Sequence, residues 1–253
     1  MLPIYARAVS GMQTSQDALD INANNIANAN TPGFDASDPI LQDLVYQDTN
    51  PRDLVVGSPA ATLQGVGTTV EATSRSGQFG QPILTGNPFD VTIAGDGYLQ
   101  VLRPDASTGY TRAGMLRVDG QGRMNIGTML LQPPVTVPQG ATDTAIRPNG
   151  QVTATVGGQQ QVIGQIQLTR FPNAQGLQSA DGTTYTTTAT TGTPLTGTPG
   201  QNGFGGFVVG SVEAARVDLS REMAALIIGE RAFTLNARAL QTVDRMVGDV
   251  TKK

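Results

Sequence analysis

The chain has 253 residues, of which only 14% are charged, and a formal net charge of -4. This length allows a substantial core in one or two domains, and the singly scattered arginines argue against nucleic-acid binding. Histidine and cysteine are absent, and Lys252 and Lys253 are the only lysines. Imidazole or thiolate metal sites, Ser-His or Cys-His catalysis and a phosphate-loop lysine are therefore excluded. We expect no cofactor, no metal and no catalytic residue.

The N-terminal segment, residues 1–34, is predicted to be an assembly helix that ends in an asparagine-rich motif. Apolar and small residues recur at three- and four-residue steps, a spacing typical of a helix with a narrow packing stripe. Five asparagines lie within nine positions, and Thr31-Pro32-Gly33 then stops the helix. These amides are either an ordinary helix stop or uncharged groups that fix register in a crowded interface. The predicted assembly residues are Ile4, Ala8, Met12, Leu19, Asn22, Asn24, Asn25, Ile26, Asn28, Pro32, Gly33 and Phe34.

Targeting and membrane signals are not expected in this sequence. The N-terminus lacks a basic stretch followed by an apolar core of about 7–15 residues, so we expect no ordinary secretory signal. No apolar run approaches the roughly 18 residues of a membrane span. If the protein leaves the cytoplasm, we expect a route that does not cleave a signal peptide, and no membrane insertion.

The middle of the chain changes to a period of two and is predicted to be β-structure. Residues 35–84, rich in proline and glycine, are expected to form an extended arm with short strands. Residues 85–182 are expected to form an antiparallel β-domain. Residues 183–210, dominated by Thr, Gly and Pro, are expected to be a poorly packed return segment. The turn signals that delimit the predicted strands are Asp96-Gly97, Asp119-Gly120, Asn149-Gly150, Gly157-Gly158 and Asp181-Gly182.

Several acidic or glycine-rich pairs in this region could carry chemistry, but each has a better structural explanation. Asp90 with Asp96, or Asp35 with Asp38, could form an acid–base pair of a glycoside hydrolase. Their turn and arm positions favour ordinary surface residues. Residues 119–125 lack the acidic spacing of a calcium loop, and residues 95–97 lack the third glycine of a dinucleotide turn.

The C-terminal segment, residues 211–253, is predicted to be a heptad helix. Large apolar residues fall seven apart, and Gly229 and Asn236 interrupt this seam. The partner of the seam is either the N-terminal helix of the same chain or a helix of another subunit. The predicted assembly residues are Leu219, Met223, Leu226, Phe233, Asn236, Leu240, Val243 and Val247.

The predicted fold is α+β, with N- and C-terminal helices packing as a coiled-coil-like pair. An antiparallel, mainly-β domain and an extended β-rich arm are inserted between them. An asymmetric helix pair that meets copies of itself through different surfaces makes heterologous contacts, which build an open helical tube if the rotation does not close. The order of elements therefore indicates an assembly part.

The sequence resembles the flagellar basal-body rod proteins, which belong with the hook proteins to one family of axial proteins. The match spans nearly the whole chain in order and is more similar to distal rod than to hook or other rod proteins. Two departures are Asp35, where the family often has a basic residue, and Phe233, where tyrosine is common. The segments that carry the resemblance are Ser10-Gly11-Met12, Asn24-Asn25-Ile26-Ala27-Asn28, Thr31-Pro32-Gly33-Phe34, Asp43-Leu44-Val45-Tyr46-Gln47, Gly65-Val66-Gly67-Thr68, residues 88–101, Gly109-Tyr110-Thr111-Arg112-Ala113-Gly114, Gly210-Ser211-Val212-Glu213, Glu230-Arg231-Ala232-Phe233, Asn236-Ala237 and Met246.

This resemblance implies a structural subunit of the rod, located in the basal body and exported by the flagellar type III apparatus. It implies polymerisation into a hollow tube that transmits torque from motor to hook and lets exported subunits pass. The implied partners are further copies of the chain, other rod and hook proteins, the export apparatus and the surrounding ring proteins. The alternatives are a proximal rod subunit or the hook protein and, from other classes, an extracellular β-solenoid carbohydrate-active enzyme or an adhesin with a coiled-coil stalk.

Overall fold

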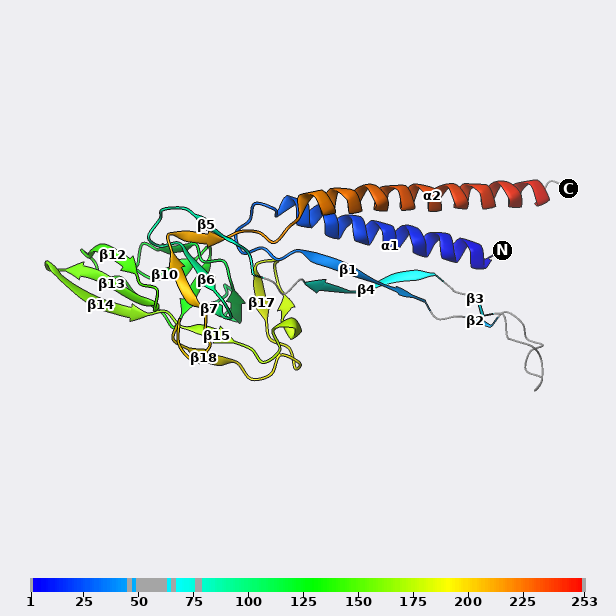
Figure 1. The fold of residues 1–253 in the computed structure, drawn as a ribbon. Helices are drawn as coiled ribbons and strands as arrows, with labels where there is room; N and C mark the ends of the chain where they lie inside the picture. Colours follow the sequence, from blue (N-terminus) through cyan, green and yellow to red (C-terminus); the bar gives the residue numbers. More distant parts are fainter. Residues whose placement is uncertain (1, 45–46, 49–62, 65–66, 76–78, 252–253) are drawn as a thin grey trace. The chain divides into compact units, whose positions relative to one another are not determined.

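The computed structural model describes residues 2–44, 47–48, 63–64, 67–75 and 79–251 and divides the chain into two compact units (Figure 1). The helical unit comprises residues 1–27, 37–75 and 218–253, and the β unit comprises residues 28–36 and 76–217. Both α-helices of the described residues lie in the helical unit, and most of the strands lie in the β unit. The predicted α+β class is confirmed.

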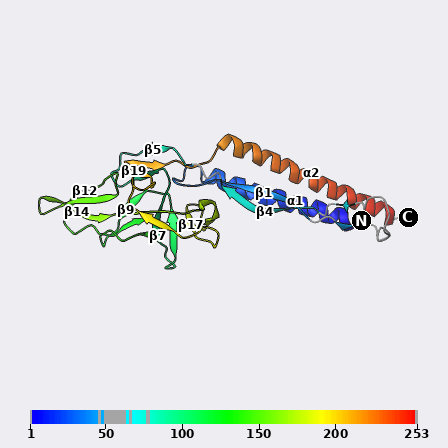
Figure 2. The same ribbon diagram turned by 60° about the horizontal axis from the view of Figure 1, so that its bottom comes forward.

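Two long helices, α1 (Leu2–Ala27) and α2 (Leu219–Thr251), lie side by side in the helical unit (Figures 1 and 2). Strands β1 (Ser37–Asp43) and β4 (Thr68–Arg75) form an antiparallel pair, and α1 contacts this pair through a 2.7 Å hydrogen bond from Thr14 Oγ1 to the Thr68 carbonyl oxygen. The short strands β2 (Gln47–Asp48) and β3 (Leu63–Gln64) also pair antiparallel. No described helix is long and apolar enough to cross a membrane.

The β unit contains the remaining strands and one short 3-10 helix. Every strand pair that the structure describes is antiparallel, whereas a β-solenoid stacks its strands in parallel, so the fold gives no support to the solenoid alternative. The elements are β5 (Pro82–Leu84), β6 (Val91–Ala94), β7 (Tyr98–Leu102), β8 (Thr108–Thr111), β9 (Leu116–Val118), β10 (Met124–Ile126), β11 (Met129–Gln132), β12 (Thr142–Ile146), β13 (Gln151–Val156), β14 (Gln159–Gln165), β15 (Leu168–Arg170), η1 (Ala174–Gly176), β16 (Gln178–Ser179), β17 (Thr184–Thr186), β18 (Leu195–Gly197), β19 (Gly206–Val209) and β20 (Ser211–Glu213).

The largest sheet has the strand order β16-β17-β8-β7-β11-β10-β9, with β15 and β18 joined to it through β7. Strands β12, β13 and β14 form a separate sheet, in which the predicted turn Gly157-Gly158 joins β13 to β14. Two further pairs, β19 with β6 and β20 with β5, bring the last strands of the unit back to its first ones. The beginning and end of the β unit are therefore adjacent.

The core of the β unit contains an aliphatic cluster and an aromatic cluster. Val91, Leu99, Leu116 and Leu168 are completely buried members of the first. The second contains Tyr185, whose neighbour in the cluster, Tyr98, meets it edge to face with ring centroids 5.8 Å apart. The β-branched and aromatic residues that alternate along the predicted strands supply most of both clusters.

Residues 183–210 are not the poorly packed return segment that their composition indicates. Within this range β17 pairs with β8, β18 with β15 and β19 with β6. Thr184 and Thr191 are fully buried, and the Thr191 hydroxyl donates a 2.7 Å hydrogen bond to the Thr188 carbonyl oxygen. Threonine is a good strand residue when its hydroxyl finds a backbone partner, which composition alone does not reveal.

Candidate assembly interface

Small residues let the two helices of the helical unit approach each other closely. A β-carbon built on Gly11 of α1 would lie 2.8 Å from the Asn236 Nδ2 atom of α2. One built on Gly229 of α2 would lie 3.0 Å from the Leu19 Cδ2 atom of α1. Gly229 and Asn236, which interrupt the apolar character of the C-terminal seam, therefore lie at the contact between the helices and allow their close approach.

On α1, the face towards the rest of the helical unit contains most of the predicted residues. Asn25 is 1% exposed, and Ala8 and Asn22 are also buried. Met12, Leu19 and Ile26 are half-buried, whereas Asn24 is exposed. The side chain of the remaining predicted residue, Ile4, lies outside the described side chains.

On α2, part of the predicted seam faces the rest of the helical unit. Leu219 and Met223, in the first turns of the helix, and Phe233 are exposed. From Leu226 to Val247 the half-buried residues follow steps of three and four, as in a heptad seam. The half-buried members are Leu226, Asn236, Leu240, Val243 and Val247.

Asn25 joins three elements of the helical unit. Its Nδ2 atom donates to the Ser37 carbonyl oxygen at 2.9 Å and to Glu222 Oε2 at 3.1 Å, and its Oδ1 atom accepts from the Ser37 backbone N–H at 3.1 Å. Glu222, at the start of α2, is 4% exposed. A short amide carries two N–H donors and a separate carbonyl acceptor, so Asn25 holds the beginning of β1 and a buried carboxylate of α2 together.

The end of the asparagine motif belongs to the β unit. Helix α1 ends at Ala27, and the Thr31 backbone N–H donates to the Asn28 carbonyl oxygen at 2.9 Å. Phe34 is 3% exposed, Pro32 is half-buried, and Gly33 has a φ of +73°. A β-carbon on Gly33 would lie 2.8 Å from the backbone nitrogen of Ala113, so this glycine allows a close approach of two backbone segments.

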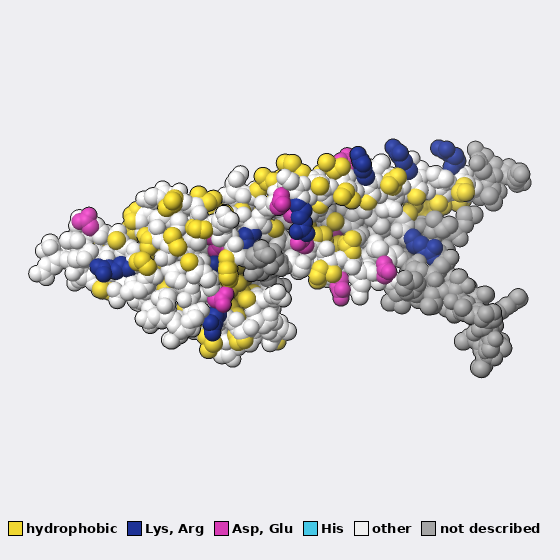
Figure 3. Space-filling view, in the orientation of Figure 1, with side chains coloured by type: hydrophobic (Ala, Val, Ile, Leu, Met, Phe, Trp, Pro, Cys, Tyr) yellow, Lys and Arg dark blue, Asp and Glu magenta, His cyan; other side chains and the backbone are white. Residues whose placement is uncertain are grey.

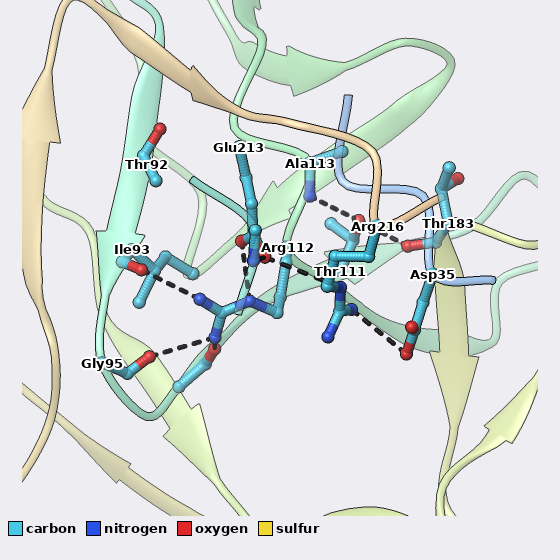
Figure 4. A network of polar contacts seen from close by, with 12 residues as sticks. Asp35, Thr92, Ile93, Gly95, Thr111, Arg112, Ala113, Thr183, Glu213 and Arg216 are labelled. Carbon is cyan, nitrogen blue, oxygen red and sulfur yellow. Dashed lines mark hydrogen bonds and ion pairs between the residues drawn. The ribbon is translucent and has the colours of Figure 1, made fainter. Parts of the chain in front are cut away.

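A buried ion pair, Arg112 with Glu213, lies at the centre of the β unit (Figure 4). The Arg112 Nε atom donates to Glu213 Oε2 at 2.8 Å, and the two side chains are 1% and 0% exposed. The remaining guanidinium nitrogens donate to the carbonyl oxygens of Ile93 (2.9 Å), Gly95 (3.1 Å) and Gly97 (2.7 Å). A buried charge is tolerated when its donors are satisfied in this way.

This arrangement explains the motif Gly95-Asp96-Gly97, which was weighed as a dinucleotide turn. Gly95 and Gly97 have φ values of +114° and +143°, a region that side chains disfavour, and the carbonyl oxygens of both accept hydrogen bonds from Arg112 Nη1. Figure 4 shows the Gly95 carbonyl pointing towards Arg112. The carbonyl groups of this motif therefore bind the guanidinium group of Arg112. In the sequence, Arg112 and Glu213 lie in two separate motifs, and neither motif predicts a role for them. The one available signal is that each is the single charged residue of an otherwise uncharged motif, residues 109–114 and 210–213.

Asp35, the acidic departure from the family pattern, also has a partner in the β unit. Its Oδ2 atom lies 3.1 Å from Arg216 Nη2, and the Arg216 backbone N–H donates to the Phe34 carbonyl oxygen at 3.0 Å. The Gly33 backbone N–H donates to the Glu213 carbonyl oxygen at 2.9 Å. The segments that begin and end the β unit are thus joined by main-chain bonds and by an ion pair, which we call the clasp.

Asp90 and Asp38, two of the four candidate catalytic carboxylates, are occupied by structural partners, as Asp35 is by Arg216. The Asp90 carboxylate accepts from the side chains of Thr85, Asn87 and Arg117 at 2.8, 3.0 and 3.0 Å. Asp38 pairs with Arg221 at 3.1 Å. Within the described ranges no three His, Cys, Asp or Glu side chains come together to hold a metal ion.

Asp119 lies in a turn whose backbone N–H groups stabilise its ionised carboxylate. Its Oδ1 atom accepts from the backbone N–H groups of Arg123 and Gln121 at 2.8 and 2.9 Å. These bonds, that of Arg123 first, hold the pKa of the Asp119 carboxyl below its ordinary value. A carboxylate stabilised by its own turn is a structural group, as the missing calcium-loop spacing also indicates.

The outer side of α2 carries large apolar side chains without cover from the described residues (Figure 3). Ile228, Leu235 and Met246 are 67%, 64% and 60% exposed and recur at helical spacing. Ile227 is 50% exposed. Contiguous exposed apolar surface of this kind marks a contact site for protein or membrane.

Comparison with known proteins identifies the class to which this fold and surface belong. Residues 7–34 match the family described as "Flagella basal body rod protein", and residues 92–154 match "Flagellar hook protein FlgE/F/G D1 domain". Residues 208–252 match "Flagellar basal body rod FlgEFG protein C-terminal". The three matches fall on the two helices and on the β unit between them.

Relatives that match from end to end narrow the class further. The chain is 36% identical over 248 residues to the flagellar basal-body rod protein FlgG of Caulobacter vibrioides, covering 95% of both chains. It is 32% identical to FlgG of Buchnera aphidicola subsp. Acyrthosiphon pisum over 98% of both. FlgF of Escherichia coli is 28% identical over 97% of this chain and 95% of its own. The chain belongs to the flagellar basal-body rod protein family, as the motifs predict.

Proposed function

We propose that this protein is a structural subunit of the distal part of the flagellar rod. It assembles with further copies of itself into a hollow helical tube that transmits torque to the hook and lets exported subunits pass. Full-length similarity to several FlgG proteins at 30–36% identity, against 28% for FlgF, supports the distal assignment over a proximal one. Other rod and hook proteins, the export apparatus and the ring proteins are its further partners.

The apolar outer side of α2 is the observation that carries this proposal. Glu222 and the half-buried residues of α2 face the rest of their own unit, so the opposite side, with Ile228 and Leu235, is available to another subunit. A cavity of 470 Å³, lined by residues of α1, α2, β1 and β4, shows that packing within one subunit is incomplete. Helices of neighbouring copies, pairing in a coiled-coil-like manner, would bury this surface in the tube wall.

The predicted assembly residues divide into two roles under this proposal. Those that face inwards, such as Asn25 and Leu240, shape the helix pair of one subunit. Those that are exposed, such as Asn24, Met223 and Phe233, contact the neighbouring subunit. A structural role agrees with the buried carboxylates of Glu222 and Asp90, which accept hydrogen bonds from Asn25 and Asn87, and the names of the relatives describe rod proteins.

Leu235→Asp tests this proposal, with Val162→Asp as its control. Leu235 is 64% exposed on α2 and Val162 is 58% exposed on β14, so the two changes are matched in exposure and chemistry. Burying a leucine contributes about 1.5–3 kcal/mol, so its replacement should raise the concentration needed for assembly more than tenfold. Purified proteins are concentrated, pelleted and imaged, and circular dichroism checks their folding.

Tubes from the wild type and from Val162→Asp, but not from Leu235→Asp, would support the proposal. The same variants can be introduced into a bacterium lacking its own rod subunit, where only Leu235→Asp should abolish motility. A wild-type chain that stays monomeric at every concentration and leaves such cells non-motile would overturn it. So would tubes from Leu235→Asp at the wild-type concentration.

A further inference from the structure

Two opposite charge patterns lie on the outer sides of the two helices. On α2, Arg231, Arg238 and Arg245 are exposed and recur every seven residues, so they form a basic row with a spacing of roughly 10 Å. On α1, the exposed residues Asp17 and Asp20 lie three positions apart and form an acidic face. Neighbouring residues of the same helix neutralise neither Asp17 and Asp20 nor Arg231 and Arg238.

The acidic face has no basic residue within one helical turn of either aspartate. The positions three and four residues before and after Asp17 and Asp20 hold no basic residue. Like charges three apart on one helix repel each other. Among the ion pairs between described residues none includes either aspartate. This face is therefore slightly unfavourable in an isolated subunit.

The basic row mirrors this situation on α2. The positions three and four residues before and after Arg231 and Arg238 hold no acidic residue, whereas Arg245 has Asp249 four residues after it. The ion pairs between described residues include neither arginine. The row borders the exposed apolar residues Ile228 and Leu235, so a helix that covers the apolar side also meets the arginines.

We infer that the basic row of one subunit contacts the acidic face of α1 in a second copy of the chain. The inference rests on the proposed function and adds which helices meet: α2 of one subunit packs against α1 of its neighbour. The two surfaces lie on different helices of the same chain, so the contact is heterologous and repeats without closing. Charge pairs that flank an apolar seam select the register and orientation of helices more than they add affinity.

Reciprocal charge reversal tests the inference. One variant carries Asp17→Arg with Asp20→Arg, a second carries Arg231→Glu with Arg238→Glu, and a third combines all four changes. Arg147→Glu, at an exposed position of the β unit, is the control for a change of net charge. The readout is the lowest concentration at which the purified full-length protein forms tubes, with circular dichroism as a check on folding.

The first and second variants should each require about tenfold higher concentration than the wild type, because two attractive pairs become repulsive. The combined variant should recover to within about threefold of the wild type, because all pairs are restored with opposite sign. Salt should raise the required concentration for both the wild type and the combined variant.

Three results would overturn the inference. In the first, the single reversals assemble as the Arg147→Glu control does. In the second, the combined variant is impaired by at least the sum of the two reversals, which means that these charges do not meet. In these first two results, the proposed function is still tested independently, by whether the wild type forms tubes and Leu235→Asp does not. In the third, the wild type forms no tubes, which contradicts the proposed function and this inference together.

Discussion

Replacing Arg112 by methionine should destabilise the β unit strongly. The change removes four hydrogen bonds, of which three go to the carbonyl oxygens of Ile93, Gly95 and Gly97. A buried carbonyl without a donor costs about 1 kcal/mol or more. Glu213, which is 0% exposed, also loses its closest cation and keeps only Arg216, at 3.9 Å; breaking one side of a buried pair costs about 3–5 kcal/mol. Since these contributions overlap, we expect a loss of about 5 kcal/mol.

Such a loss is large against the roughly 5–15 kcal/mol that stabilises an ordinary domain. Urea unfolding can follow it through the near-ultraviolet circular dichroism of Tyr98, Tyr110 and Tyr185, which lie in the aromatic cluster of the β unit. With a slope of about 2 kcal/mol per molar urea, the midpoint should fall by about 2.5 M. Arg112→Lys should be intermediate, because an ammonium cannot reach four acceptors as the guanidinium fork does.

Arg123→Met is the matched control, since Arg123 pairs with Asp119 at the surface and is 44% exposed. It should cost no more than about 1 kcal/mol. Arg112→Met combined with Glu213→Leu should recover part of the loss, because the buried Glu213 carboxylate is then no longer left without Arg112. If Arg112→Met shifts the midpoint no further than Arg123→Met does, the buried pair is not what holds these segments together.

Three further changes test other parts of the structure. Gly33→Ala should cost at least about 2 kcal/mol more than Gly86→Ala, since both glycines have a φ of +73° but only Gly33 faces backbone within 4 Å; equal urea midpoints would contradict this. Asn25→Ala should lower the thermal midpoint of α-helical circular dichroism by several degrees, through about 2 kcal/mol of lost buried bonds, whereas the exposed Asn24→Ala should change it little; an equal effect of both would refute the assigned role. Burial raises the pKa of the Tyr110 phenol, so its stabilisation is complete below the ordinary value of 10.0 and is lost as pH rises through the higher folded value; the alkaline loss of stability should shrink in Tyr110→Phe, and an unchanged pH profile would argue against it.

The hydrophobic pattern predicted the architecture because each period reflects a local geometry. The step of three and four residues placed α1, and alternation with turn dipeptides placed antiparallel strands where β13 and β14 meet at Gly157-Gly158. The seven-residue repeat of α2 found the helix and, at Leu226, Leu240 and Val247, residues of its half-buried side. It did not show that Leu219 and Met223 are exposed or that Gly229 allows a close contact with Leu19.

The polar residues were harder to interpret, because their partners lie far away in the sequence. Asn25 looks like part of a helix stop until Glu222 is brought next to it. Arg112 looks like one of many scattered arginines until three carbonyls and Glu213 surround it. A local pattern specifies the element that carries a side chain, but long-range pairing specifies what that side chain binds.

The clasp of the β unit has a consequence for when the protein can fold. Asp35 and Arg216 lie near opposite ends of the chain, and the segments that contain them also share main-chain hydrogen bonds. A chain that emerges from its N-terminus cannot complete the β unit until residues 213–216 have followed, because contacts of such long sequence separation form late. Any leading stretch that lacks these residues therefore also lacks the contacts that close the β unit, and the finished unit appears only when the last part of the chain is present.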